Sequence, residues 1–383
     1  MRFSIVTGAF PPALDGIGDY TALLANELAG AHQVAVITGT SNPDASRIYS
    51  VSCGFDCTKI WSTLRLVQHV KRFGPDWLSI QYCPFSYGRY GWNPFLPLAL
   101  TRLRRAAPEL RIALTVHEAM AWPVNWKLRT MNLWQGPLLR ILTGLSTVSF
   151  VVVGKWRTVY RRWLRSNRVV HLPVGSNIPA TGNSVSNARK SLGISDDVLV
   201  LGVFGQGHHS HDWSKVAAAT RSIVAKGYDL LLLHMGSGSD RAHSEFHGLP
   251  NHVTGRLSAA RLSECLMASD IFVAPFVDGV STRRGTLMAA LQHALPVVGT
   301  HGDATDEALS DADGKALLLV PCDDQDAFTD AVLRLIADAQ LRAHLGDGAR
   351  RLYEARFSWP VIAQTMVETL EDTPPYHSGG RSI

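Results

Sequence analysis

The sequence has no apolar run long enough to cross a membrane. Its longest apolar stretches, 149–153 and 230–233, are far shorter than the roughly 20 residues that a membrane helix needs. The amino terminus starts with a strand-like segment, 2–6, and lacks the basic and then apolar layout of a secretory signal. We therefore expect a cytoplasmic protein.

Cysteine is scarce and scattered, with no paired spacing beyond the one that separates Cys53 from Cys57. This pattern favours reduced, mostly buried thiols over a disulfide or metal framework. We expect no bound metal and no cofactor. The five residues are Cys53, Cys57, Cys83, Cys265 and Cys322.

Charged residues are few, at 18% against 46% hydrophobic residues, which is typical of a soluble globular protein. A chain of 383 residues is too long to fold around one hydrophobic core, so we predict two domains. Up to Gly175 there are 20 Lys and Arg against 8 Asp and Glu, a balance of +12, and the remainder has 17 against 24, a balance of −7.

The basic amino half has two clusters, at 102–105 and 155–165, on patterns that predict helices. Such charge runs are usually solvated helix faces. Two functional alternatives stay open, namely peripheral contact with an anionic membrane at its inner face and binding of a phosphate-bearing acceptor. No nucleic-acid partner is expected.

Apolar, β-rich segments recur along the chain, and a helical pattern follows each of them. This alternation is typical of parallel sheets with crossover helices. The predicted strands of the first half are 2–6, 33–38, 77–81, 111–116, 149–153 and 169–172. Those of the second half are 198–204, 229–235, 271–274, 296–298 and 316–320. The predicted fold class is α/β, with two doubly wound Rossmann-like domains.

A stretch rich in Pro, Gly, Ser and Asn, 173–184, marks the boundary between the two. We predict an amino-terminal domain over 1–178 and a carboxyl-terminal domain over 190–356. An amphipathic helix follows over 357–372, with a proline at an early helical position. The tail, 373–383, should be mobile.

Ligands of doubly wound sheets bind at the carboxyl ends of the strands, near helix amino termini. After the first strand, Gly16 and Gly18 would let the backbone approach a phosphate-bearing substrate closely, although the third glycine of a dinucleotide fingerprint is missing. His117, at the end of strand 111–116, can donate to a sugar hydroxyl or steady developing charge. Taken singly, each feature is more often structural.

The segment 274–298 is the most informative, because a strand, a glycine-containing loop and a helix start follow one another. Backbone N–H groups near Gly285 and Thr286 would point at a diphosphate, and Arg283 or Arg284 can add charge-assisted contacts. The alternative is an ordinary loop with solvated arginines.

A further loop, 204–215, leaves the first strand of the second domain and contains three histidines and an aspartate. Adjacent histidines in a flexible loop rarely converge on a metal, so phosphate or sugar contact is preferred to zinc, with an ordinary loop as the alternative. We predict that Gln206 and His211 contact a sugar or nucleoside and that Lys215 contacts a phosphate.

The whole pattern resembles glycosyltransferase family 4, the retaining, metal-independent enzymes with the GT-B fold. The resemblance covers almost the whole chain and rests on segments in the family's order: 10–18, 151–154, 172–175, 234–238, 253–257, 268–275 and 357–359. It implies a nucleotide-sugar donor on the second domain, a hydroxyl-bearing acceptor on the first, and a last helix that crosses back to the first domain. His117 would match the family's cleft histidine.

The chain departs from the family's pattern at the donor site. The family usually has two glutamates there, whereas Asp278 or Ser281 occupies the first region and Ala289 stands at the second, ribose-binding position. The Arg and Lys that usually meet the donor phosphates appear as Gln206 and His211. The segment 281–285, Ser-x-Arg-Arg-Gly, is similar to that of a branch of the family.

The resulting prediction is a retaining glycosyltransferase that uses a nucleotide sugar and needs no metal. The helix start and the arginines would hold the leaving diphosphate, Asp278 and His117 would orient the sugar, and Ser281 and Gly255 would contact the donor sugar or nucleoside. The alternatives are a GT-B phosphorylase or nucleotide-sugar epimerase, and a non-catalytic partner subunit, which Ala289 would favour. An NAD-dependent dehydrogenase is least favoured, for want of its glycine fingerprint.

Overall fold

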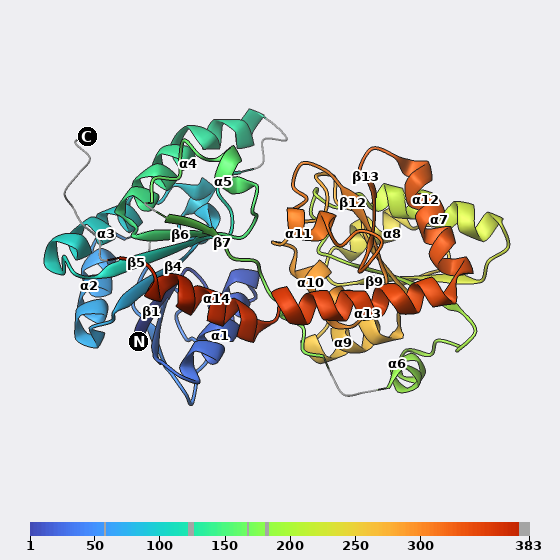
Figure 1. Cartoon of the computed structure of the whole chain (residues 1–383), viewed down its shortest axis with the longest axis horizontal. Helices are drawn as coiled ribbons and strands as arrows, with labels where there is room; N and C mark the ends of the chain where they lie inside the picture. The colour runs from blue at the N-terminus through green and yellow to red at the C-terminus, as the bar shows by residue number, and fades with distance from the viewer. Residues whose placement is uncertain (57–58, 122–125, 167, 181–183, 375–383) are drawn as a thin grey trace. The chain divides into compact units, whose positions relative to one another are not determined.

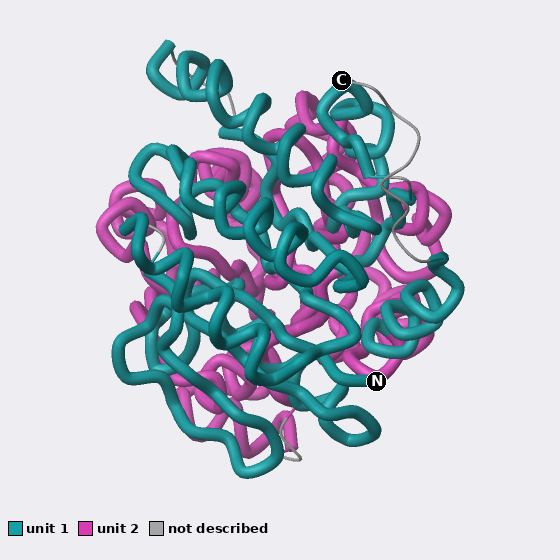
Figure 2. Tube along the Cα trace, turned by 90° about the vertical axis from the view of Figure 1, so that its left-hand side faces the viewer, with its two compact units in different colours: residues 1–173, 362–383 teal, residues 174–361 magenta. Residues whose placement is uncertain are grey.

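The computed structural model describes residues 1–56, 59–121, 126–166, 168–180 and 184–374. Contacts divide the chain into two compact units (Figure 2). Unit 1 comprises Met1–Pro173 and Ile362–Ile383, and unit 2 comprises Val174–Val361. None of the helices within the described ranges is both long and apolar enough to cross a bilayer.

Unit 1 contains a parallel seven-stranded sheet in the order β3-β2-β1-β4-β5-β6-β7 (Figure 1). The strands are β1 (Arg2–Thr7), β2 (Gln33–Thr38), β3 (Ser50–Cys53), β4 (Trp77–Tyr82), β5 (Arg111–Val116), β6 (Val148–Val151) and β7 (Arg168–His171). The helices are α1 (Gly16–Ala29), α2 (Ser62–Phe73), η1 (Pro84–Ser86), η2 (Arg89–Gly91), α3 (Phe95–Ala106), α4 (Trp126–Leu145) and α5 (Trp156–Val159).

Unit 2 contains a parallel six-stranded sheet in the order β10-β9-β8-β11-β12-β13. The strands are β8 (Leu199–Phe204), β9 (Leu230–Met235), β10 (Asn251–Val253), β11 (Ile271–Ala274), β12 (Val297–His301) and β13 (Leu318–Pro321). The helices are α6 (Val185–Leu192), α7 (Trp213–Ala225), α8 (Ser239–Glu245), α9 (Ala259–Ala268), α10 (Gly285–Gln292), α11 (Glu307–Ser310), α12 (Gln325–Ala337) and α13 (Ala339–Arg356).

The β11 strand shows why its sequence is apolar without alternation. Successive side chains of a strand point to opposite faces of the sheet. Ile271 and Val273 pack in the hydrophobic cluster that includes α7 and α12, whereas Phe272 and Ala274 pack in the cluster that includes α9, α10 and α13. Both faces of the sheet are therefore covered, as expected for a doubly wound fold.

The last helix, α14 (Trp359–Glu371), is shared by the two units. It begins in unit 2, where the Trp359 Nε1 group donates to the Ser176 carbonyl at 2.7 Å. From Ile362 onward it belongs to unit 1, where Arg168 Nη1 donates to the Thr369 carbonyl at 3.1 Å. The tail was predicted to be mobile from residue 373, but Thr373 is buried and donates to the same carbonyl; residues 375–383 lie outside the described residues.

The predicted segments all correspond to strands, and the sequence reading missed only two, β3 and β10, among the described residues. Both are edge strands of three or four residues with no buried position, so their sequences carry no apolar run. The contact division falls at Pro173, a few residues before the predicted boundary at 178.

The described cysteines are free thiols. The prediction that they are mostly buried is wrong for Cys53, which lies on an exposed edge strand, and for the half-buried Cys322. Cys83 and Cys265 are buried, and Cys57 lies outside the described residues.

His234 makes the stability of unit 2 depend on pH. It is fully buried in β9 against the rings of Trp213 and Phe246, and burial lowers its pKa to about 4. The folded protein keeps this imidazole neutral, whereas the unfolded chain binds a proton near its ordinary pKa of about 6.5. The free energy of unfolding therefore falls as the pH drops from about 6.5 towards 4.

Between pH 7 and pH 5, protonation of His234 in the unfolded chain should lower the free energy of unfolding of the wild type by roughly 1–2 kcal/mol. We predict that His234→Leu does not show this loss. Urea unfolding at the two pH values measures the difference. His252→Leu, at an exposed position of the neighbouring strand β10, is the matched control and should change the free energy of unfolding by less than about 0.5 kcal/mol. Equal pH dependence in wild type and His234→Leu would contradict the prediction.

Candidate active site

The strand order of unit 2 reverses between β8 and β11, the position where doubly wound sheets bind ligands. Two loops leave the carboxyl ends of these strands, 205–212 and 275–284. A bridge joins His211 to Phe276, the Asp212 N–H donates to the Pro275 carbonyl at 2.7 Å, and the Val277 N–H donates to the Ser210 carbonyl at 3.0 Å. The two loops therefore form one continuous surface.

Asp278 binds both arginines of the predicted anion loop. Its buried carboxylate accepts from Arg283 Nη2 at 2.9 Å and from Arg284 Nη2 at 2.7 Å. The Arg284 guanidinium also donates to Ser210 Oγ at 3.1 Å and lies 4.1 Å above the ring centre of Phe276. One carboxylate against two guanidinium groups leaves a net positive charge on this group of three side chains, which we call the arginine clamp.

The loop that bears the clamp is held by the loop that follows β12. Gly279 has a φ of 87°, and a Cβ there would lie 2.4 Å from the Gly302 nitrogen, so only glycine fits. Thr282 donates to the buried Asp306 carboxylate from its backbone N–H at 2.8 Å and from its hydroxyl at 2.6 Å. The positions of the arginines are thus set by contacts beneath the surface.

Helix α10 begins at Gly285, directly after the clamp, and no side chain of the described residues caps it. Gly285 and Thr286 are half-buried, and the nearest atom to a Cβ added at Gly285 would be Asn177 Oδ1 at 3.9 Å. That distance is an ordinary van der Waals contact, so Gly285 is not tightly packed at the start of a helix whose N–H groups and dipole favour an anion.

His211 and Gln206 lie on the first loop, which α8 holds in place. Arg241 of α8 donates to the carbonyls of Gly207 and His211 at 3.2 and 3.0 Å. Burial, followed by the charge of Arg284, lowers the pKa of His211 to about 3. His211 is therefore neutral near pH 7 and cannot replace a cationic residue as a charge for phosphate.

Among the described residues, three other predicted donor residues make no side-chain contact with the clamp, although the Ser281 carbonyl accepts from the Arg284 N–H at 3.0 Å. Lys215 is buried in α7, with its Nζ atom 5.9 Å from the ring centre of Phe328 in α12. Ser281 is fully buried within the loop, so it supports the loop and offers no accessible surface in this structure. Gly255 follows β10, at the edge of the sheet, with a φ of 65°.

In unit 1, the strand order reverses between β1 and β4, and His117 follows the next strand, β5. Its Nε2 atom lies 2.8 Å from Oε1 of the buried Gln81, whose amide nitrogen donates to Ser79 Oγ at 3.1 Å. An amide oxygen only accepts, so Nε2 carries the proton and Nδ1 is left as an acceptor. Burial lowers the pKa of His117 to about 3, so it acts as a neutral imidazole.

Gly16 opens α1, but the amino end of this helix already has an acidic cap. Asp15 Oδ1 accepts from the N–H groups of Ile17 and Gly18 at 3.0 and 2.8 Å. A Cβ added at Gly16 would meet no atom within 4 Å, so a ligand can approach this residue. The carboxylate of Asp15 competes with a phosphate for the same helix end.

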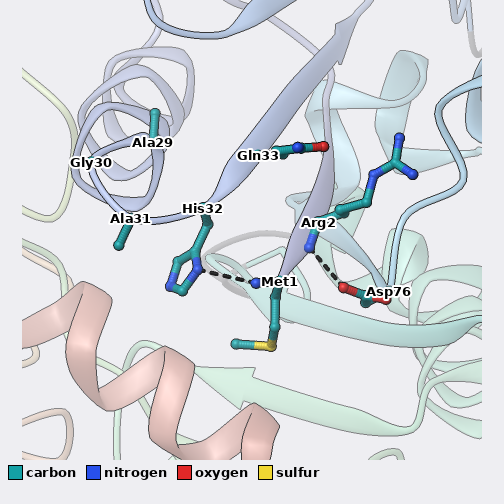
Figure 3. A pocket seen from close by; sticks show the side chains of 8 residues that line it. All are labelled: Met1, Arg2, Ala29, Gly30, Ala31, His32, Gln33 and Asp76. Carbon is teal, nitrogen blue, oxygen red and sulfur yellow. Dashed lines mark hydrogen bonds between the residues drawn. The ribbon is translucent and has the colours of Figure 1, made fainter.

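A cavity of about 510 Å³ lies elsewhere in unit 1 (Figure 3). Its lining includes the residues that start β1 and β2, Arg2 and Gln33, and Asp76 before β4. It therefore lies at the amino ends of the strands, opposite the edge that bears His117. No group of three or more His, Cys, Asp or Glu within the described ranges is arranged to hold a metal ion.

Sequence reasoning found the arginines but missed their partners. Ser210, Arg241 and Gln81 come from other loops, strands or helices than the residues they orient, whereas Phe276 lies on the same loop as Arg284. Only the strand order, which brings β8 beside β11 and β4 beside β5, could have indicated these pairs.

Comparison with known proteins agrees with this architecture. A family model described as Glycosyl transferases group 1 matches residues 195–338. A GDP-mannose-dependent monoacylated alpha-(1-6)-phosphatidylinositol monomannoside mannosyltransferase of Corynebacterium glutamicum is 24% identical over 97% of this chain and 98% of its own length. A phosphatidyl-myo-inositol mannosyltransferase of Mycolicibacterium smegmatis is 29% identical over 40% of each chain.

Among solved structures, sucrose-phosphate synthase from Thermosynechococcus elongatus superposes with a TM-score of 0.70 over 97% of this chain and 98% of its own, at 17% identity. This likeness confirms the predicted GT-B fold of two Rossmann-like domains. By sequence and by fold, the chain therefore resembles glycosyltransferases of the group 1, family 4-like type.

Proposed function

We propose that this protein is a glycosyltransferase that moves a hexosyl group from a nucleoside diphosphate sugar, held by unit 2, to a hydroxyl group of a lipid-linked acceptor, held by unit 1. The arginine clamp at the start of α10 is the observation that carries the proposal. A diphosphate needs concentrated positive charge, and the clamp and the helix dipole supply it at one place.

The clamp and the helix start would stabilise the leaving group. As the bond from the anomeric carbon to the diphosphate oxygen breaks, the electron pair stays on that oxygen, next to guanidinium and N–H donors. The acceptor oxygen forms the new bond to the anomeric carbon, and its proton passes to the departing phosphate. With these charges in place, the reaction needs no metal, and attack on the face that the phosphate leaves gives retention.

Asp278 fits a positioning role better than the predicted contact with the sugar, because both its oxygens accept from the arginines. His117 fits a hydrogen-bond acceptor for a sugar hydroxyl through Nδ1. The predicted role of His117 is to donate to a sugar hydroxyl or to steady developing charge; its low pKa means that it would do so without a positive charge of its own. Ala289 is fully buried in the core, so contact with a ribose must come from other residues.

The relatives narrow the substrates to test first. One is named as GDP-mannose-dependent, and both act on phosphatidylinositol-type acceptors by name. GDP-mannose is therefore the first donor, UDP-glucose the second, and an anionic glycolipid is the first acceptor class. Isothermal titration calorimetry with each nucleotide sugar, in EDTA, tests the donor. Absence of binding to every nucleotide sugar would favour the non-catalytic partner subunit.

Replacing Arg283 and Arg284 together by Ala is predicted to lower kcat/KM by about 1,000-fold or more, because each charged donor to a developing oxyanion contributes about 100- to 1,000-fold. Steady-state turnover of the donor found by calorimetry measures the change. Arg351→Ala, at an exposed position of α13, is the control and should be silent.

The double Lys variant, R283K with R284K, keeps the charge that Asp278 needs and guards against misfolding of the Ala pair. It should fold like the wild type and show intermediate activity, because lysine cannot make the bidentate contacts of arginine. Wild-type turnover in the double Ala variant would remove the clamp from the donor site.

His117→Asn is predicted to lower kcat/KM by about 3- to 10-fold, the range of one neutral hydrogen bond. With a pKa of about 3, His117 stays neutral from pH 6 to pH 8, so the pH profile of the variant should keep the wild-type shape. A profile of kcat/KM against pH for both proteins makes the comparison. Loss of an ionisation from the profile in His117→Asn would show that the imidazole titrates during catalysis.

A further inference from the structure

Helix α4 of unit 1 has a second apolar side that the core does not cover. Leu139 and Leu142 pack into the hydrophobic core, as helical spacing predicts for one side. Trp126, Leu133 and Ile141 are 71%, 75% and 49% exposed. Seven and eight residues separate them, which is about two helical turns each, so they share one side of the helix.

Basic residues flank this exposed side. Lys127, Arg129 and Arg140 are all exposed, and none takes part in an ion pair within the described residues. The Lys127 ammonium lies 5.8 Å from the ring centre of Trp126, and Arg140 Nη1 donates to the Arg162 carbonyl at 2.7 Å. We call these six residues, Trp126, Lys127, Arg129, Leu133, Arg140 and Ile141, the α4 face.

The sequence around the α4 face carries positive charge only. From 119 to 195 it contains no Asp or Glu, and within 119–173 it contains nine Lys and Arg. The 156–165 segment lies against α4, since a Cβ added at Gly136 would touch the Trp163 ring, and it contributes the exposed Arg161 and Arg162. The positive charge of α4 is therefore continued by its neighbour.

Exposed aromatic residues border α4 on the side of η2. The Tyr90 carbonyl accepts from Trp134 Nε1 and Gln135 Nε2, each at 3.1 Å, which holds η2 against α4. Tyr90 and Trp92 are 52% and 56% exposed. Exposed tyrosine and tryptophan beside lysine and arginine are the residue types that favour the boundary between lipid headgroups and acyl chains.

We propose that the α4 face docks on an anionic lipid bilayer, with the helix lying in the plane of the interface. The apolar side chains would enter the headgroup region while the lysine and arginines meet lipid phosphates. A nucleic acid would satisfy the charges but would leave the apolar side chains in water. Through the α4 face, the enzyme of the proposed function would reach a lipid-linked acceptor. Vesicle binding tests this face without any measurement of turnover.

The experiment is sedimentation of the full-length chain with vesicles of phosphatidylcholine, with or without phosphatidylglycerol. We expect binding to the anionic vesicles only. Lys127→Gln with Arg129→Gln should weaken it about 30-fold, since each basic residue near an anionic surface contributes a factor of about five. Leu133→Ser with Ile141→Ser should weaken it about 10-fold or more.

The matched control is Arg221→Gln with Lys226→Gln at exposed positions at the end of α7 in unit 2, which should bind like the wild type. All the substituted residues are exposed, so thermal unfolding should be unchanged in every variant. Equal binding to neutral and anionic vesicles, or wild-type binding by both α4 variants, would overturn the proposal. So would an equal loss in the control pair.

Binding to a duplex DNA oligonucleotide tests whether a nucleic acid, rather than a lipid bilayer, occupies the α4 face. The lipid proposal is refuted if the wild type binds DNA but not vesicles, and if DNA binding is lost in the Lys127 and Arg129 variant but kept in the Leu133 and Ile141 variant. That result would assign the surface to nucleic acid. Vesicle binding without donor turnover would leave the docking surface intact and count only against the proposed reaction.

Discussion

The buried carboxylate of Asp278, shared between Arg283 and Arg284, is the interaction on which the candidate donor site depends. Taking a carboxylate out of water costs several kcal/mol, and the cost is offset only when its oxygens are fully satisfied. Here both oxygens are engaged by guanidinium groups, so the arginines are held in one arrangement before any ligand arrives. A surplus positive charge remains, which is the property that an anion-binding loop requires.

Other groups of the candidate sites are also held in one orientation by hydrogen bonds from neighbouring elements. Thr282 is held by Asp306 from the loop after β12, the loop 205–212 is held by Arg241 from α8, and His117 is held by Gln81 from β4. Each oriented group thus receives its direction from a neighbouring loop, helix or strand. Such preorganisation lowers the conformational entropy that binding would otherwise cost.

The sequence predicted the sheets well, because buried parallel strands such as β4 and β11 are continuous apolar runs. The arginine loop followed from its place between a strand and a helix start. The pairing of Asp278 with both arginines could not be predicted, since it depends on the left-handed turn at Gly279 and on the loop that packs beneath it. The short edge strands β3 and β10 were missed because nothing apolar distinguishes them.

Because α14 starts in unit 2 and ends in unit 1, unit 1 is assembled from two separate pieces of the chain. A ribosome releases all of unit 2 before it releases the second piece of unit 1, so the first unit stays incomplete until the segment from Ile362 onward has been made. Two covalent connections, one at Pro173 and one within the helix at Ile362, join the units. A single protease cut at either connection would leave both halves tethered, and only cleavage at both would release them.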